Sequence, residues 1–570
     1  MGKEKQVLVY FWSCLFFLFA CTTQNYRERA KGGRIYGGTL HLGMSEPVSD
    51  LFPLSSNDYY SERVYSQIFE PLLTLDPKTL KVIPCLATSY SVSPDAKKFK
   101  FIIRKGVLFH PDVCFGSNGR ELTATDVKFS LEMACSGLKM NTVSRVLVHR
   151  IKGAHAFFEQ TKHSLSNRHV QGIRVIGKYQ LEIELNEPFI GFDKVLTMSA
   201  LGVFPKEAWD YYHWDIGRHP VGTGPFILGD FNQVKMTLHK NQRYWKKDTF
   251  GNKLPFLDGI EIHLFSNKKS ELVAFRNQQT DLVFDIPAEQ VDHVLGSFSD
   301  ALNNRNIKHK VATCASYNMS FIGFNCKNKL FKDRKIRQAF SLAINRKVLV
   351  NAWLNGEGYP ADKGFIPTIG SYRNTKVLNS LFDPGLAKTL LKDAGYPNAQ
   401  NFPKIDFYVN AKKGSPAYRM CQGIVQQLSS NLGVKLRLVS CTLKERNKAI
   451  ATGKASMWRS GWIADYPDAE NFLVMLYHGG ERGMKETKNS YRFQHPLFDS
   501  CFEQAMKEVN ESKRNQCYVQ CVNLVAQDTP VIPVYSNDYM VMYRSRVKQF
   551  FLNPMQTMHF SHVYLQANDQ

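Results

Sequence analysis

A regular alternation of strand and helix patterns between residues 405 and 459 constrains the fold of this chain more than any other feature. The ranges 405–409, 434–438 and 455–459 are predicted strands, and the first two carry apolar residues at every second position. Helical patterns fill the gaps at 415–433 and 442–453. A β-α-β-α-β order closes almost always as a right-handed parallel sheet. The sequence therefore predicts an α/β protein.

The segment that follows the third strand of this unit is the candidate ligand site. Parallel α/β sheets bind their ligands outside the carboxyl ends of the strands. Here the sequence runs from Arg459 to Asp468 and contains one cation, two carboxylates and the aromatic residues Trp462 and Tyr466, in a loop with Gly and Pro.

The rest of the chain mixes strands and helices. A capping box at Thr123–Asp126 begins one helix, and Asp333 begins another whose apolar positions recur every four residues as far as Val348. Asp383-Pro384 begins a third helix, which Gly395 ends. Further strand patterns lie at 39–43, 99–104, 234–239 and 260–264.

The N-terminus predicts export and a lipid anchor. Lys3 and Lys5 precede an apolar run over 7–20, which is the pattern of a signal peptide. The sequence Leu-Phe-Ala-Cys that ends at Cys21 resembles the lipobox of bacterial lipoproteins and implies a lipid on Cys21. A simple signal peptide cut nearby and a buried helix are the alternatives. Of 12 cysteines, ten follow the leader and Cys21, and an oxidising compartment allows some of them to pair.

Charge and motifs exclude several function classes. The formal net charge is +23, which favours anionic partners, but an evenly basic surface explains it better than nucleic-acid binding. No Gly-x-Ser-x-Gly, His-Glu-x-x-His or phosphate-loop motif occurs, so neither a hydrolase nor an NTPase is expected. Gly222–Pro225 is predicted to be a structural turn, and His559 and His562 lack a third nearby ligand. No cofactor and no metal site is expected.

Six stretches resemble one family when taken in order. Together they are similar to the peptide-binding proteins of bacterial ABC importers, that is, the oligopeptide- and dipeptide-binding members of extracellular solute-binding protein family 5. The likeness covers nearly the whole chain after the leader. It implies a periplasmic-binding-protein type II-like fold, with two lobes around a cleft and a third domain inserted in the N-terminal lobe. The stretches are 66–72, 86–90, 123–127, 220–226, 336–346 and 461–466.

The resemblance also implies a division of the chain. We expect a signal peptide, a lipidated tether, a discontinuous N-terminal lobe, an inserted domain and a second lobe. The signal peptide is 1–20 and the tether is 21–34. The N-terminal lobe combines 35–77, 201–315 and 526–570. The inserted domain is 78–200 and the second lobe is 316–525.

Residue roles follow from the same resemblance. Asp465 matches the carboxylate that pairs with the peptide α-ammonium, and Arg459 matches the guanidinium that helps to hold the peptide carboxylate. Trp462, Tyr466 and Tyr60 complete the expected ligand-binding set. The alternatives stay open: Asp465 caps the loop, Arg459 forms a structural ion pair, and the two aromatic residues of the loop pack beside the hinge.

The implied function is a non-enzymatic receptor that closes around short peptides and delivers them to the permease subunits of an ABC transporter. The expected location is the periplasmic face of the cell envelope, as a lipid-anchored monomer that binds no nucleic acid. The alternative is the same scaffold binding a non-peptide solute, such as a nickel chelate, a sugar oligomer or a muropeptide. An envelope adhesin is a further competing class.

Overall fold

A computed structural model describes residues 28–48, 50–55, 58–116, 119–165, 168–284, 309–353, 358–373, 381–478 and 489–566. The predicted leader, the predicted lipidation site Cys21 and the first part of the tether lie outside these ranges. Within them, no helix is both long and apolar enough to cross a bilayer.

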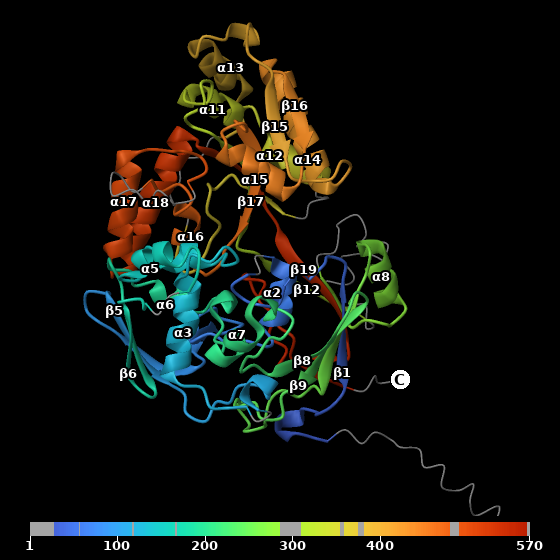
Figure 1. The fold of residues 1–570 in the computed structure, drawn as a ribbon. Helices are drawn as coiled ribbons and strands as arrows, with labels where there is room; N and C mark the ends of the chain where they lie inside the picture. Colours follow the sequence, from blue (N-terminus) through green and yellow to red (C-terminus); the bar gives the residue numbers. More distant parts are fainter. Residues whose placement is uncertain are drawn as a thin grey trace, which may run out of the picture.

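The first large sheet gathers strands from three distant parts of the sequence. It has seven strands in the order β12-β19-β11-β1-β10-β9-β8. In Figure 1 it fills the lower right of the molecule. The strands are β1 (Thr39–Met44), β8 (Phe226–Phe231), β9 (Lys235–Lys240), β10 (Gly259–Leu264), β11 (Leu282–Phe284), β12 (His309–Ala315) and β19 (Asp538–Arg544). Helix α8 (Lys268–Arg276) lies beside β1 and β11, and α2 (Tyr59–Tyr65) and α7 (Lys206–Tyr212) contribute to the hydrophobic core of the sheet.

The second large sheet contains the predicted β-α-β-α-β unit. Its order is β14-β18-β13-β17-β15-β16, and β15 pairs in parallel with both β16 and β17, as predicted. The strands are β13 (Asn318–Phe324), β14 (Tyr359–Pro360), β15 (Ile405–Val409), β16 (Leu436–Ser440), β17 (Met457–Ile463) and β18 (Val531–Ser536). The helices are α11 (Arg334–Leu342), α12 (Arg346–Trp353), α13 (Pro384–Asp393), α14 (Pro416–Leu432), α15 (Leu443–Ala451), α16 (Glu470–Leu473), α17 (Pro496–Lys507) and α18 (Glu511–Asp528).

A third, smaller sheet forms from residues of the predicted insertion. Its order is β4-β5-β7-β6, and it shares one hydrophobic core with the seven-stranded sheet. Its strands are β4 (Ala87–Val92), β5 (Lys98–Ile103), β6 (Ile173–Gly177) and β7 (Gln180–Glu184), with helices α3 (Ala124–Cys135), α4 (Ser144–Leu147), α5 (Ala154–Gln160) and α6 (Phe192–Val195). Two small pairs complete the strands: β2 (Leu73–Leu75) with β3 (Val82–Pro84), and β20 (Val547–Lys548) with β21 (Tyr564–Leu565).

Local sequence signals account for many element ends. Ser415 accepts a hydrogen bond from the backbone of Tyr418 at the start of α14, and Gly433 ends that helix with φ of 75°, a conformation that costs glycine little. The capping box predicted at Thr123 is present at the start of α3. Short-range hydrogen bonds of this kind need no tertiary partner, which is why the sequence reveals them.

Two predicted elements are wrong in extent. The helix predicted from Asp333 to Val348 is two helices, because side chains of α14 bind the backbone between them: Gln427 accepts from the Asn345 amide at 2.6 Å. Val348 is consequently 53% exposed rather than buried. The strand predicted at 455–459 is β17, which continues to Ile463 because it pairs with β13 along seven residues.

All ten cysteines that the structure describes are free, so the expected pairing does not occur among them. Cys517 and Cys521 are buried small residues of α18.

The chain passes between the two large sheets at two adjacent places, after β12 and after β18. Asn318 and Asn537 join these two connections: the Asn318 side chain donates to the Asn537 carbonyl at 2.8 Å and accepts from the Asn537 amide at 3.1 Å. Paired short connections of this kind are where a hinge between two lobes would lie.

The domain bounds given in the sequence analysis stay a prediction. One of them conflicts with the strand pairing, because β18 pairs with β13 and β14 in the six-stranded sheet although 526–570 was assigned to the N-terminal lobe. We propose that the second lobe extends through β18 and that its boundary lies near Asn537.

Candidate functional site

The candidate loop is shorter than the sequence suggests, and its residues divide between a strand and a turn. Arg459 and Trp462 lie on β17, and only the residues from Ala464 onward leave the sheet. Trp462 donates from Nε1 to Oδ1 of Asn471 at 2.8 Å, and the same oxygen accepts from the Asp465 amide at 3.0 Å. Asn471 therefore performs the loop-capping role considered for Asp465, and it fixes both residues.

Asp465 lies beside α4, within the predicted insertion. Its Oδ2 lies 3.4 Å from Nη2 of Arg145, whose guanidinium carbon also lies 5.6 Å from the centre of the Trp462 ring. The side chain of Asp465 is 25% exposed and that of Arg145 is 34% exposed, so water reaches this ion pair. An exposed ion pair is weak, and a competing cation can replace Arg145 at modest cost.

A second carboxylate lies near Asp465. Burial and then the charge of Asp465 raise the pKa of Glu62, on α2, to about 7, while a hydrogen bond from Ser199 acts to lower it. The carboxylates of α2 and of the turn after β17 are thus close enough to interact, so a single added cation between them would stabilise both.

Arg459 does not pair with Asp465. Its charge acts on Cys421 of α14 and on Arg446 of α15. Six residues of extended chain separate it from Asp465, or at most about 20 Å. Of the two predicted charges, Arg459 therefore lies within β17 and Asp465 lies in the turn just beyond its end.

Tyr466 is 1% exposed and belongs to the core shared by the seven-stranded sheet and the insertion. Its hydroxyl donates to Glu470 and accepts from Nη2 of Arg150 at 3.2 Å. The packing alternative fits this burial better than direct ligand contact. Tyr60 is partly exposed on α2, where the Arg63 guanidinium lies 5.2 Å from its ring.

Two further ion pairs join the predicted insertion to the segment around α16. Nη2 of Arg150 lies 2.5 Å from Glu470, and Nζ of Lys194 lies 2.8 Å from Asp468. Burial acts to raise the pKa of Asp468, but Lys194 and Arg514 hold it below its ordinary value. Figure 1 shows the insertion's helices against α16 and α18 at this place.

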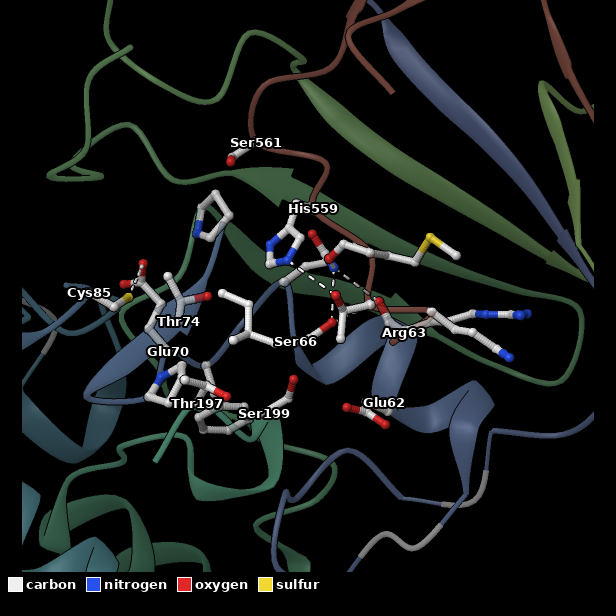
Figure 2. A pocket seen from close by; sticks show the side chains of 18 of the residues that line it. Glu62, Arg63, Ser66, Glu70, Thr74, Cys85, Thr197, Ser199, His559 and Ser561 are labelled. Atoms are coloured by element: carbon white, nitrogen blue, oxygen red, sulfur yellow. Dashed lines mark hydrogen bonds between the residues drawn. The ribbon is translucent and has the colours of Figure 1, made fainter. Parts of the chain in front are cut away.

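A cavity of about 80 Å³ lies behind Glu62. Figure 2 shows residues of α2, the 197–199 segment and the C-terminal segment around it. Its polar lining includes Glu62, Glu70, Lys246 and His559. Ligand pockets usually measure about 300–1,000 Å³, so this cavity suits water or one side chain rather than a whole peptide.

Sequence reasoning missed Glu62 and Arg145. Both are ordinary polar residues of helical segments, and each acquires its role from a residue more than three hundred positions away in the sequence. The signals near Glu62 were the predicted ligand residue Tyr60 on the same helix and the family-like stretch at 66–72, which follows the end of α2 directly.

The comparisons with known proteins decide the family. A profile described as bacterial extracellular solute-binding proteins, family 5, matches residues 81–484. The chain belongs to this family. Its members are solute-binding transport proteins rather than enzymes, and the α/β fold with two lobes of the type II periplasmic-binding kind is as predicted.

Named relatives match almost the whole chain at low identity. The glutathione-binding protein GsiB of Salmonella typhimurium is 25% identical over 520 residues, which cover 90% of this chain and 92% of that protein. Heme-binding protein A of Haemophilus influenzae is 26% identical over 500 residues, covering 86% and 85%.

Solved structures share the fold. The periplasmic binding protein DppA of Helicobacter pylori, in complex with the peptide STSA, has a TM-score of 0.78 at 24% identity and covers 94% of this chain and 99% of its own. A periplasmic oligopeptide-binding protein of Borrelia burgdorferi has a TM-score of 0.76 at 24% identity, covering 93% and 100%.

Proposed function

We propose that this protein captures short peptides with a free amino terminus between its two lobes and delivers them to the permease of an ABC importer. One observation carries the proposal: Asp465 of the second lobe faces Glu62 of the first lobe and Arg145 of the insertion. Membership of a solute-binding family supports it, and so does the peptide bound by the H. pylori neighbour.

The peptide ammonium binds Asp465 in place of Arg145. Glu62 lies close enough to Asp465 to add a second negative charge once it loses its proton. The backbone of the peptide pairs with protein backbone, which satisfies its hydrogen bonds without reading side chains.

The partner of the peptide carboxylate depends on peptide length. An extended dipeptide or tripeptide spans roughly 7–11 Å, which is about half of the roughly 20 Å that six residues of extended chain can put between Asp465 and Arg459. Arg145 is the nearer cation for such ligands, whereas peptides of about five or six residues reach Arg459. The planar guanidinium suits either task because it binds a carboxylate through two nitrogens.

We further propose that the protein acts at the periplasmic face of the cell envelope as a monomer tethered through a lipid on Cys21. The polar segment 21–34 supplies the length that lets the lobes reach a permease. Labelling with a radioactive fatty acid tests the anchor: the native chain incorporates label, and Cys21→Ser does not.

Isothermal titration with peptides of two to six residues tests the binding function. We expect Asp465→Ala to weaken free-amine peptides by at least about tenfold while N-acetylated peptides, already weak, change little. Asp406→Ala is the matched control, because Asp406 also pairs with an arginine, Arg437 at 2.6 Å, but lies on β15 away from the gap. Equal losses for free-amine and acetylated peptides would contradict the role of Asp465.

Two arginine variants test the length argument. Arg145→Ala should weaken dipeptides and tripeptides, and Arg459→Ala should weaken only the longer peptides. Mass spectrometry of ligand retained by the native protein addresses the alternative: a metal chelate, sugar or other non-peptide solute in place of peptides would refute the proposed class.

A further inference from the structure

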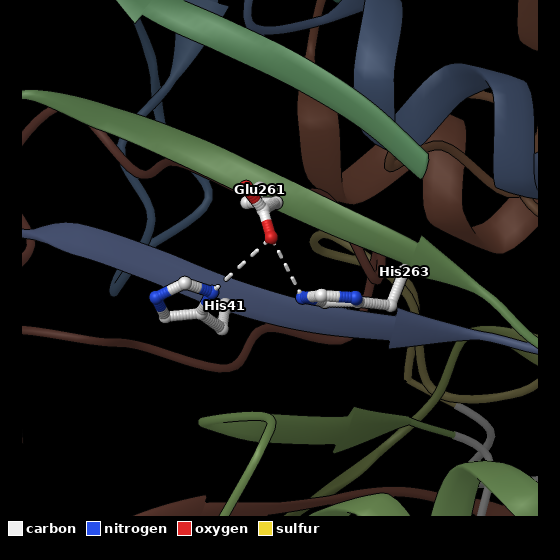
Figure 3. A group of neighbouring side chains, drawn as sticks. All are labelled: His41, Glu261 and His263. Carbon is white, nitrogen blue, oxygen red and sulfur yellow. Dashed lines mark ion pairs between the residues drawn. The ribbon is translucent and has the colours of Figure 1, made fainter. Parts of the chain in front are cut away.

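A cluster of metal-ligating side chains lies on the seven-stranded sheet, apart from the proposed peptide site. His41 of β1 and Glu261 and His263 of β10 each offer one ligand atom, and these atoms lie within 4.8 Å of one another. Figure 3 shows the three side chains pointing toward one another from two neighbouring strands.

The sheet fixes this arrangement. β1 and β10 are parallel neighbours, with His41 opposite Glu261 and Gly43 opposite His263. Residues two apart on a strand share a face, so Glu261 and His263 project together toward the side on which His41 lies. Leu40, Leu42 and Ile262 point to the opposite face, into the main core. The backbone amide of His41 is also held by the buried carboxylate of Asp281 at 2.9 Å.

The distances suit a transition-metal ion. In a tetrahedral zinc site the metal–ligand bonds are about 2.0–2.1 Å, which places ligand atoms about 3.4 Å apart. Here Oε1 of Glu261 lies 3.0 Å from Nε2 of His263 and 3.9 Å from Nδ1 of His41. Small side-chain rotations bring all three atoms to one ion.

The state of His263 also points to a ligand. Its Nε2 is buried, and although it lies 3.0 Å from Glu261, the angles do not form a hydrogen bond, so this nitrogen lacks a hydrogen-bond partner among the described residues. A neutral imidazole with an available lone pair is the form that binds metals.

We infer that His41, Glu261 and His263 form a binding site for one divalent transition-metal ion, with Zn²⁺, Co²⁺ or Ni²⁺ as fitting occupants. Two imidazoles and a carboxylate favour these ions over Ca²⁺ and Mg²⁺, which prefer all-oxygen sites. Three protein ligands leave a fourth position for water or for a donor group of another molecule. The site goes beyond the proposed peptide function and does not depend on it.

Lys235 is the group that opposes metal binding. Its Nζ lies 3.4 Å from Oε2 of Glu261 and competes with a cation for the same carboxylate. Its side chain is 41% exposed, so it can turn away into water when a metal binds. Removing this lysine should therefore strengthen the site rather than weaken it.

Co²⁺ titration of the purified protein, without a histidine tag, tests the inference. We expect one Co²⁺ per chain, displaced by Zn²⁺, with a visible ligand-field spectrum but no thiolate-to-cobalt charge-transfer band. His41→Ala and His263→Ala should each weaken binding at least about tenfold, and Lys235→Met should tighten it. Circular dichroism of the metal-free variants checks that they fold.

A matched control is the double variant His149→Ala/His155→Ala, which removes two imidazoles whose ring centres lie 5.5 Å apart in the insertion. It should leave Co²⁺ affinity unchanged. A thiolate band would assign the metal to the free cysteines instead and overturn the inference. So would Co²⁺ binding that survives in both histidine variants, no Co²⁺ binding at all, or unchanged affinity in Lys235→Met.

Discussion

The raised pKa of Glu62 makes the stability of this protein depend on pH in a predictable way. The pKa rises from 4.5 to about 7, chiefly because the carboxyl is buried and then because Asp465 is near. The folded chain therefore keeps a proton that the unfolded chain releases as pH rises from 4.5 to 7. The contribution of the protonated Glu62 to the free energy of unfolding is complete below pH 4.5 and is lost as pH rises through 7.

The size of the effect follows from the shift. One pKa unit corresponds to about 1.4 kcal/mol, so the change from 4.5 to about 7 amounts to roughly 3 kcal/mol. Glu62→Gln keeps the shape of the side chain and removes the ionisation. We expect this variant to match the native protein at pH 4 and to exceed its free energy of unfolding by up to about 3 kcal/mol at pH 8.

Urea unfolding of the two proteins at several pH values, followed by tryptophan fluorescence, measures this difference. Glu187→Gln controls for the loss of one negative charge, because Glu187 lies on the exposed surface of the insertion. In an Asp465→Asn background the gain from Glu62→Gln at pH 8 should shrink, since the second-largest cause of the shift is gone. A difference that is the same at pH 4 and pH 8 would refute the reasoning.

Three further predictions concern the ligand, the interface and the hinge. Binding of a free-amine peptide at pH 6.5 should release part of a proton from Glu62, seen as a buffer-dependent heat that Glu62→Gln abolishes; a heat independent of the buffer would contradict this. Glu470→Gln leaves the Arg150 charge without its partner and should lower the free energy of unfolding by about 3–5 kcal/mol in the same urea assay. The double variant Arg150→Met/Glu470→Leu should recover most of this loss. Equal losses of stability in the single and the double variant would argue against a buried-charge penalty. Asn318→Ala breaks both hydrogen bonds to Asn537 and should cost about 1–3 kcal/mol in urea unfolding, while an unchanged midpoint would show that this pair does not hold the connections together.

The sequence by itself determined the features that depend on neighbouring residues. The β-α-β-α-β unit and the capping of α3 and α14 follow from short spacings, because helix caps and strand alternation are local. The same reasoning selected Asp465, since the segment after β17 is where a parallel sheet places ligands.

The tertiary structure alone decided which residues face Asp465 and where elements end. Strand β17 is longer than predicted because it pairs with β13, and the helix predicted after Asp333 is two helices because side chains of α14 bind the backbone between them. Strand β18 lies in the six-stranded sheet, although its sequence neighbour β19 lies in the seven-stranded one. Glu62 and Arg145 meet Asp465 from roughly 400 and 320 positions away in the sequence. In the separate metal-ligand cluster, His41 meets Glu261 and His263 from roughly 220 positions away. Contacts at such separations are set by how sheets and lobes pack, which no local pattern records.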